Sequence, residues 1–267
     1  MRFEPRPSDT TADLLGVCVL GPDAAFAVGR GGVALRWEGT RWEREDTGTD
    51  EDLYAVCAQG NELYAVGGNL AVGGHSLIAH RAGGRWTTSR SPVQSILLAV
   101  DARDGLVRAS GFNGALVEKT PEGWRELAAP TNTHLFGIHA TGSGWLACGL
   151  AGTLVELPTT LTSVGAAHLT SLAACGDDEV AVGFDGTIAR RSDGRWQVLA
   201  QVTREHLWSI TSFDGRAIAV GAHGAMVEVV DGRTRILDSG IAADLHGVGA
   251  MEGLVIAVGR SGTIIHG

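Results

Sequence analysis

Three histidines stand at matching places in a repeated sequence, where together they could hold a metal ion. His134, His168 and His206 each directly precede a leucine that opens an apolar run. Neutral imidazole nitrogens are common ligands of zinc and similar ions. The same place in the other repeats holds Asp13, Asp52, Ile96 and Asp244. Two interpretations follow: a divalent metal site on the three histidines, or side chains that satisfy backbone groups where a strand begins.

A repeat must position these side chains, because the residues around them recur along the whole chain. Each unit starts with a leucine-led run such as "LYAV", whose third residue is Gly, Ala or Ser. A second apolar run, a glycine turn and a third run follow, and a fourth run begins near "GRW". Short β-branched runs bounded by glycine predict strands. The glycine after the second run recurs at intervals of 38, 44, 38, 34, 38 and 38 residues: Gly29, Gly67, Gly111, Gly149, Gly183, Gly221 and Gly259.

Seven units of four strands predict an all-β fold, a single seven-bladed β-propeller with four-stranded blades. The expected blades are residues 13–50, 51–94, 95–132, 133–166, 167–204, 205–242, and 243–267 completed by 1–12. The last unit lacks a fourth strand, and Arg2 and Phe3 match the Arg-Trp pair that opens this strand elsewhere. We therefore expect the N-terminal strand to complete the last blade and close the ring, whereas an open solenoid would need polar caps.

An aromatic residue opens the expected fourth strand in most units. We expect it to fill the space between blades rather than to stack on a ligand. The fourth and sixth units lack it, and the outer strand of the fourth is expected within "LPTTLTSV". The aromatic residues are Phe3, Trp42, Trp86, Trp124 and Trp196.

The composition and the N-terminal sequence argue against several classes of function. The formal net charge is −9 and no basic cluster occurs, so a nucleic-acid partner is not expected. No apolar run is long enough to span a membrane and no signal peptide is evident, so we expect a cytoplasmic protein without membrane insertion. No CxxC motif occurs, and the four cysteines are expected to be free thiols in the core: Cys18, Cys57, Cys148 and Cys175.

The pattern "L-x-G-V … A-V-G-x-x-G-T-I-x-x-x-x-D-G-x-W" resembles the Ycf48-like and BNR-like propeller repeats of bacteria, within the wider WD40/YVTN type. The resemblance covers Asp13 to Gly267 and the N-terminal segment. It implies a propeller whose founding members bind other proteins, one of them a photosystem assembly factor, and are not enzymes. The segment "SDGRW" departs from the sialidase-type Asp-box, so a glycosidase is not implied. Searches for HExxH, GxSxG, P-loop and Rossmann motifs are also negative.

The turn between the second and third strands is the predicted binding face. We expect it on the same face of the ring as the start of the first strand. It varies between units and is about six residues longer in the second unit, within "NLAVGGHS". The glycine-rich stretch "GGNLAVGG" is interpreted as a long hairpin loop and not as a phosphate cradle. Because aromatic and arginine residues anchor interfaces, the candidate residues are Arg30, Asn69, His75, Phe112, Asn113, Phe184, Asp185, His223 and Arg260.

The opposite face is expected to carry short acidic turns such as "GPDA" and "GDDE" with little to anchor a partner. The predicted function is that of a non-catalytic, monomeric, protein-binding propeller that acts as an assembly factor, adaptor or inhibitor and needs no cofactor. The alternative is a metal-dependent lyase or hydrolase with a divalent ion at the rim of His134, His168 and His206. A carbohydrate-binding propeller is a second alternative, which the unequal turns of the repeats disfavour.

Overall fold

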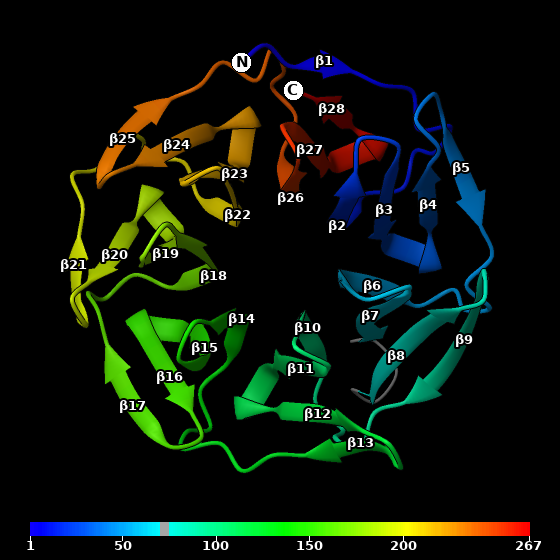
Figure 1. Cartoon of the computed structure of the whole chain (residues 1–267), viewed down its shortest axis with the longest axis horizontal. Coiled ribbons are helices and arrows are strands. Elements are labelled where there is room, and N and C mark those ends of the chain that lie inside the picture. Colours follow the sequence, from blue (N-terminus) through cyan, green and yellow to red (C-terminus); the bar gives the residue numbers. More distant parts are fainter. Residues whose placement is uncertain (70–74) are drawn as a thin grey trace.

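The computed structural model describes residues 1–69 and 75–267, and these form seven four-stranded antiparallel sheets arranged in a ring (Figure 1). The chain is therefore the seven-bladed β-propeller that the repeat predicts. In the first six blades, the strands follow one another outward from the channel in chain order. The first, innermost strands are β2 (Leu14–Gly21), β6 (Asp52–Gln59), β10 (Leu97–Arg103), β14 (Leu135–Thr141), β18 (Leu169–Cys175), β22 (Leu207–Phe213) and β26 (Leu245–Met251).

The remaining strands and the short 3-10 turns between the second and third strands complete each blade. The second strands are β3 (Ala24–Gly29), β7 (Glu62–Asn69), β11 (Leu106–Gly111), β15 (Gly144–Gly149), β19 (Asp178–Gly183), β23 (Arg216–Gly221) and β27 (Leu254–Gly259). The turns are η1 (Arg30–Gly32), η2 (Phe112–Gly114), η3 (Leu150–Gly152), η4 (Phe184–Gly186), η5 (Ala222–Gly224) and η6 (Arg260–Gly262). The third strands are β4 (Ala34–Trp37), β8 (His75–Ala82), β12 (Leu116–Thr120), β16 (Thr153–Leu157), β20 (Ile188–Ser192), β24 (Met226–Val230) and β28 (Ile264–His266).

The outermost strands are shorter than most of the inner ones. The fourth blade has its outer strand within "LPTTLTSV", where the sequence places it. These strands are β5 (Trp42–Glu45), β9 (Arg85–Arg90), β13 (Gly123–Glu126), β17 (Thr160–Ser163), β21 (Arg195–Val198), β25 (Arg233–Ile236) and β1 (Glu4–Pro5).

Small residues at the third position of the leucine-led runs let the first strands of neighbouring blades approach closely. A Cβ atom on Gly16 would lie 3.0 Å from the Cα of Ala55 in the next blade. A Cβ atom on Gly137 would lie 3.0 Å from the carbonyl oxygen of Thr170. Both distances are shorter than normal carbon contacts, so the crowding around the channel explains why this position holds Gly, Ala or Ser.

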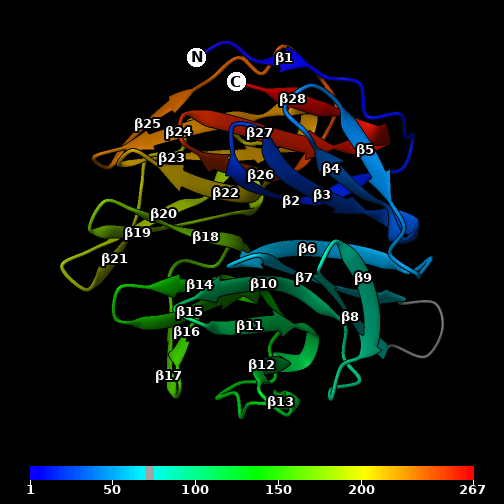
Figure 2. The ribbon, with the colours of Figure 1, turned by 45° about the vertical axis from the view of Figure 1, so that its right-hand side comes forward.

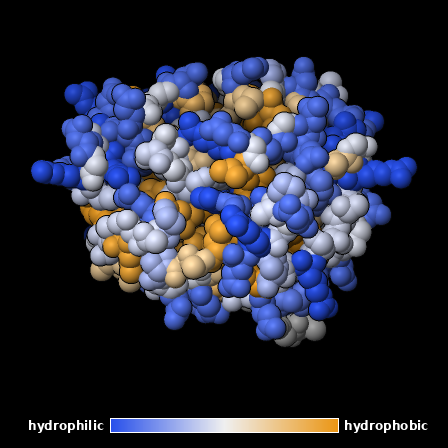
Figure 3. Space-filling view, turned by 60° about the horizontal axis from the view of Figure 1, so that its bottom comes forward, coloured by the Kyte–Doolittle hydropathy of each residue, from blue (hydrophilic) through white to orange (hydrophobic). Residues whose placement is uncertain are grey.

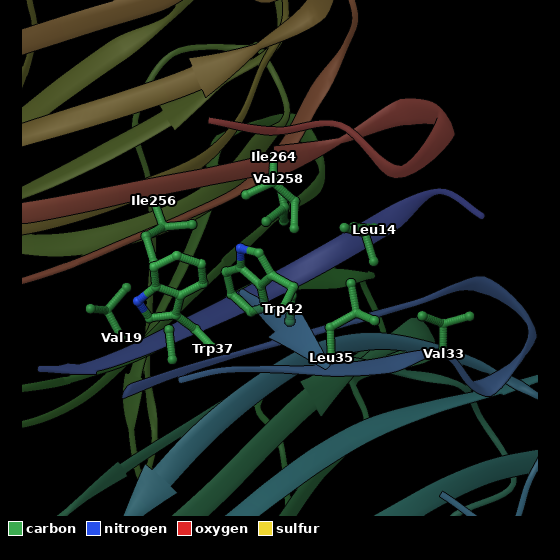
Figure 4. Close-up of a cluster of buried hydrophobic side chains, with 11 residues drawn as sticks. Leu14, Val19, Val33, Leu35, Trp37, Trp42, Ile256, Val258 and Ile264 are labelled. Carbon is green, nitrogen blue, oxygen red and sulfur yellow. The ribbon is translucent and has the colours of Figure 1, made fainter. Parts of the chain in front are cut away.

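Apolar side chains pack between adjacent blades rather than within one blade. Buried residues of the described chain form seven clusters, one at each junction of the ring. At the junction of the first and last blades, Trp37 and Trp42 pack with Ile256 and Val258 (Figure 4). The two indole ring centroids lie 5.6 Å apart in a tilted arrangement. The blades are therefore stable only as neighbours, which is the property of a repeat architecture.

The aromatic residues at the outer strands occupy these junctions, as the sequence predicts. Trp86 joins the cluster between the first two blades, and Trp124 packs against the cluster between the second and third. Trp196 packs against residues of the fourth blade. Phe3 is buried among residues of the sixth and last blades. In the fourth blade, Trp145 of the second strand fills the corresponding space.

The N-terminal segment closes the ring. β1 pairs antiparallel with β28, with Glu4 opposite His266 and Pro5 opposite Ile265. The sheet order of the last blade is β1-β28-β27-β26. The amide of Arg6 donates to the carbonyl of Ile264 at 2.9 Å, and both chain ends lie at this blade (Figure 2). The N-terminal strand therefore completes the last blade and closes the ring, as the sequence predicts.

Deletion of residues 1–8 should destabilise the protein strongly, because it removes the pairing of β1 and the buried ring of Phe3. Loss of a large buried aromatic side chain alone typically costs about 3–5 kcal/mol, and the deletion also exposes sheet edges that promote association. Thermal unfolding and light scattering measure both effects. A truncated protein that stays monomeric and melts within about two degrees of the intact chain would show that the closure contributes little.

His266 makes the closing junction sensitive to pH. Its ring lies 4.7 Å from the ring of Trp37, and its Nε2 accepts a hydrogen bond from Trp42 Nε1 at 3.3 Å. Burial, together with the nearby charge of Arg6, lowers the pKa of His266 from 6.5 to about 4. Between about pH 6.5 and pH 4, His266 takes up a proton in the unfolded chain but not in the folded chain.

The free energy of unfolding should therefore fall as the pH drops from about 6.5 to 4, by up to about 3 kcal/mol from His266 alone. Above pH 6.5 this contribution is fully present. The variant His266→Gln keeps a hydrogen-bond acceptor but cannot take up the proton, so its stability should depend less on pH. Urea unfolding at pH 4.5 and 7.5 measures the difference, with His246→Gln as a matched variant. Equal pH dependence in wild type and His266→Gln would contradict the assignment.

Candidate binding face

The turns η1 to η6 lie on the face of the ring where the first strands begin. In each blade the start of the first strand pairs with the end of the second, as Leu14 pairs with Gly29 and Leu135 with Gly149. The turn follows immediately. We call this surface the turn face. Asn69 and His75 flank the second blade's turn, and residues 70–74 of the expected insertion lie outside the described residues.

A repeated hydrogen bond ties each described turn to the next blade. The backbone amides of Asn113, Ala151 and Asp185 donate to an Nδ1 atom at 2.9–3.0 Å. The accepting rings belong, in that order, to His134, His168 and His206.

Aspartates accept the equivalent hydrogen bond at three other junctions. Asp13 accepts from the amide of Ser261 at 2.9 Å, and Asp52 accepts from Gly31 at 3.0 Å. Asp244 accepts from the amide of His223 at 2.8 Å. The hydrogen bond from the amide of Ser261 also lowers the pKa of Asp13 below its usual value. This position can therefore hold either histidine or aspartate, because both side chains accept from a backbone amide. The hydrogen bonds agree with the interpretation that these side chains satisfy backbone groups where a strand begins.

The three histidines are spaced apart by other side chains. The ring of Phe184 lies between two of them, with its centroid 5.0 Å from His168 and 4.6 Å from His206. Within residues 1–69 and 75–267, no group of three or more His, Cys, Asp or Glu side chains is placed to hold a metal ion. Because each Nδ1 atom already accepts a hydrogen bond, a metal at this rim would have to use the Nε2 atoms. A metal site here remains a prediction.

The shared role predicts that the two residue types are interchangeable. His168→Asp and His206→Asp should each fold with a stability within about 0.5 kcal/mol of wild type. His168→Ala and His206→Ala should lose about 1–2 kcal/mol, because a turn amide loses its acceptor. Urea unfolding distinguishes the two pairs. If the aspartate variants are as unstable as the alanine variants, the hydrogen bond is not what this position provides.

Phe112 and Phe184 extend an aromatic layer from the rim toward the channel. Phe112 lies 4.7 Å from the ring of His134, and Phe184 is stacked on His206 and meets Trp208 edge-on at 5.5 Å. Both phenylalanines stay half-buried although they sit in tight turns. The histidine rings thus explain why each phenyl ring is partly buried, and each ring also stays partly exposed at the surface.

The mouth of the central channel lies beside this aromatic layer. The channel has a volume of about 400 Å³ and is lined by the first strands of all seven blades. The residue before each strand-opening leucine is the predicted site, but the residue after this leucine is the one that lines the mouth. These residues are Leu15, Tyr54, Leu98, Phe136, Thr170, Trp208 and His246. The aromatic rings at this position in four of the seven repeats, Tyr54, Phe136, Trp208 and His246, are the signal that could have identified it.

Deeper in the channel, Asp101 and His139 form a bridge between three blades. His139 Nδ1 donates to Asp101 Oδ2 at 3.0 Å, and the amide of Ala174 donates to His139 Nε2 at 3.1 Å. Both nitrogens of the ring are therefore occupied in a neutral tautomer. The pair holds the first strands together and has no free nitrogen to act as a base.

The charged candidates are partly engaged within the protein. Arg30 Nε lies 3.2 Å from Asp13 and its Nη1 lies 3.3 Å from Asp52, so this arginine bridges two rim aspartates while its side chain stays exposed. His223 Nδ1 donates to Glu205 Oε2 at 2.7 Å, and this hydrogen bond raises the pKa of His223. Arg260 is exposed on the next blade.

The other candidates have partners as well. His75 Nε2 lies 2.8 Å from Glu51 Oε1, and Asn69 is opposite His75 in the hairpin of the second blade. Asp185 is exposed, with its carboxylate 3.6 Å from His206 Nδ1. The turn face therefore brings all of the candidate residues to one side of the ring, but its charges are largely paired.

The four cysteines are free in this structure, and Cys18 is the one that is not fully buried. Burial raises the pKa of the Cys18 thiol to about 12 and also raises those of Cys57 and Cys148. These side chains therefore stay protonated at neutral pH and do not act as thiolate nucleophiles. Across the described ranges, the structure contains no helix of the length and apolar character that crossing a membrane requires.

The sides of the ring carry a second, more scattered apolar surface. Leu161, Val198 and Ile236 occupy the same register of three successive outer strands and are 50–61% exposed. Figure 3 shows apolar residues between polar ones on the side of the ring where β13 and β17 run. The corresponding residues of other blades are Arg44, Thr88, Glu126 and Pro5.

Comparison with known structures identifies the fold. A structure of YCF48 bound to a D1 peptide superposes with a TM-score of 0.77 and 17% identity over 100% of this chain and 94% of its own. YCF48 from Cyanidioschyzon merolae gives a TM-score of 0.75 and 14% identity over 100% of this chain and 98% of its own. The WD40 β-propeller domain of Doa1 gives a TM-score of 0.79 and 14% identity over 99% of this chain and 97% of its own. No protein-family model and no curated protein sequence matches the chain.

Proposed function

We propose that this propeller binds another protein through the turn face and acts, as a monomer, as an assembly factor, adaptor or inhibitor. The observation that carries the proposal is the pair of partly exposed phenylalanines, Phe112 and Phe184, held in tight turns beside a channel mouth that carries further aromatic residues. Aromatic residues in such positions are typical anchors of protein interfaces. A propeller of the same fold has been solved with a peptide bound, which supports a protein or peptide as the partner.

The opposite face offers a weaker alternative. Its hairpins carry two exposed apolar residues, Leu106 and Met251, each 40% exposed, in addition to the acidic residues that the sequence predicts there. They lie in blades three and seven and have no aromatic neighbour of the kind that Phe112 and Phe184 have. Because both pairs are large apolar side chains at the surface, Leu106 and Met251 serve as controls for a test of the turn face.

The double variant Phe112→Ala/Phe184→Ala should weaken partner binding at least tenfold, because loss of an interface anchor costs about 2 kcal/mol or more. The control Leu106→Ala/Met251→Ala should bind like wild type. The partner is first identified by affinity purification from the native host, and its purified form is then titrated calorimetrically against each variant. Thermal melts verify that both variants fold. Binding that survives the first double variant and is lost in the second would place the interface on the opposite face.

A further inference from the structure

The turn face is divided into an uncharged half and a charged half. Over the third and fourth blades and their junctions, the turns and loops contain no Asp, Glu, Lys or Arg, although 19% of the chain is charged. We call this surface the neutral half, and it consists of residues 91–96, 112–114, 127–134, 150–152 and 164–168. Around the closure of the ring, the same face carries Arg6, Asp9, Asp13, Arg30, Asp50, Glu51, Asp52, Asp244 and Arg260.

A groove crosses the neutral half between the second and third blades. Its volume is about 590 Å³, and its lining includes the amide side chains of Gln94, Asn113 and Asn132 together with Ala129. Gln94 and Asn132 are exposed, and Asn113 Nδ2 donates to Ser95 Oγ at 3.2 Å. The charged member of the lining is Glu126, in the last position of β13. Apart from the carboxylate of Glu126, the side chains that line the groove therefore offer neutral donors and acceptors.

The groove is continuous with the aromatic layer at the channel. Asn113 follows Phe112, whose ring packs on His134, and His134 in turn lies 6.4 Å from Phe136 at the mouth. Trp208, also at the mouth, has an indole N–H that is buried and finds no acceptor in the described part of the chain. The amide side chains of the groove therefore lie next to the aromatic residues of the channel mouth.

We propose that the neutral half binds an extended, uncharged segment of the partner protein. In this arrangement, which rests on the proposed function, the backbone of the segment hydrogen-bonds with Gln94, Asn113 and Asn132. An apolar side chain of the segment packs on Phe112 and Phe136 at the channel mouth. Amide side chains can both donate to and accept from a peptide backbone.

The electrostatics of the two halves favour this occupant. An anionic segment on the neutral half would lose hydration without gaining a counter-charge, and a cationic segment would meet the single carboxylate of Glu126 in the groove lining. On the charged half, Arg30 is already paired with Asp13 and Asp52, so less charge is free to attract an ionic segment. Binding to the neutral half should also depend little on salt, because screening acts on charges.

The test uses the intact chain and synthetic nonapeptides with acetylated and amidated ends. One set has a Gly/Ser/Asn background with a central Leu, Phe or Trp, and the matched sets carry two Lys or two Asp in the background. We expect the uncharged set to bind better than both charged sets, with a Kd that changes less than twofold between 50 and 300 mM salt, a range over which screening of ion pairs grows strongly. Fluorescence polarisation of labelled peptides measures both.

Matched variants locate the site. Phe112→Ala, and the charge-adding variant Gln94→Glu/Asn113→Asp/Asn132→Asp, should each weaken binding of the uncharged peptide about tenfold or more. Asp185 holds the position of Asn113 in another blade with the same positive φ, so aspartate is tolerated there. The control is Asp50→Asn, at the position of the charged half that is equivalent to Asn132, and it should bind within twofold of wild type.

Two results would overturn the inference. One is that no uncharged peptide binds, or that a charged set binds better. The other is that Asp50→Asn weakens binding while Phe112→Ala does not, which would move the contact to the charged half and leave the proposed turn face intact. Loss of binding only in Leu106→Ala/Met251→Ala would contradict the turn face itself, so the two proposals fail in distinguishable ways.

Discussion

Apolar packing between neighbouring blades is the constraint on which this structure depends. A four-stranded blade exposes two apolar faces, and each face is buried only by the next blade in the ring. The ring is therefore stable only when closed, and closure requires a strand from the other end of the chain. The aromatic residues of the outer strands fill the wedge-shaped space that opens between blades as they diverge from the channel. Because packing is shared in this way, damage to one junction weakens its neighbours.

The same constraint creates the candidate binding surface. The first strands converge on the channel, so the turns that lead from the second strands are brought together around its mouth. Each described turn is then fixed to the next blade by an amide that donates to a histidine or an aspartate. The turns consequently present Phe112 and Phe184 from a rigid support. An interface with little conformational entropy to lose on binding is favoured over one built from mobile loops.

Charge is distributed on this support without regard to the repeat. The backbone geometry is nearly the same in every blade, yet one side of the turn face carries paired ions and the other carries none. Because the fold tolerates either kind of residue at these exposed places, the division is not a requirement of folding. It is a property of the surface, and it is the reason to look for an uncharged partner segment.

The period of the sequence determined the fold, the number of blades and the closure. A 38-residue unit with four glycine-bounded runs has few ways to bury its apolar residues, and Phe3 matched the tryptophans that plug the other junctions. The sequence also placed the turns on one face, because strand order in an antiparallel sheet fixes this. Only the tertiary structure decided what the rim histidines do, since an acceptor's partner, such as the amide of Asn113 for His134, comes from another blade. Likewise, the channel mouth of Phe136 and Trp208 is formed by residues more than seventy positions apart, and only the closed ring brings them together.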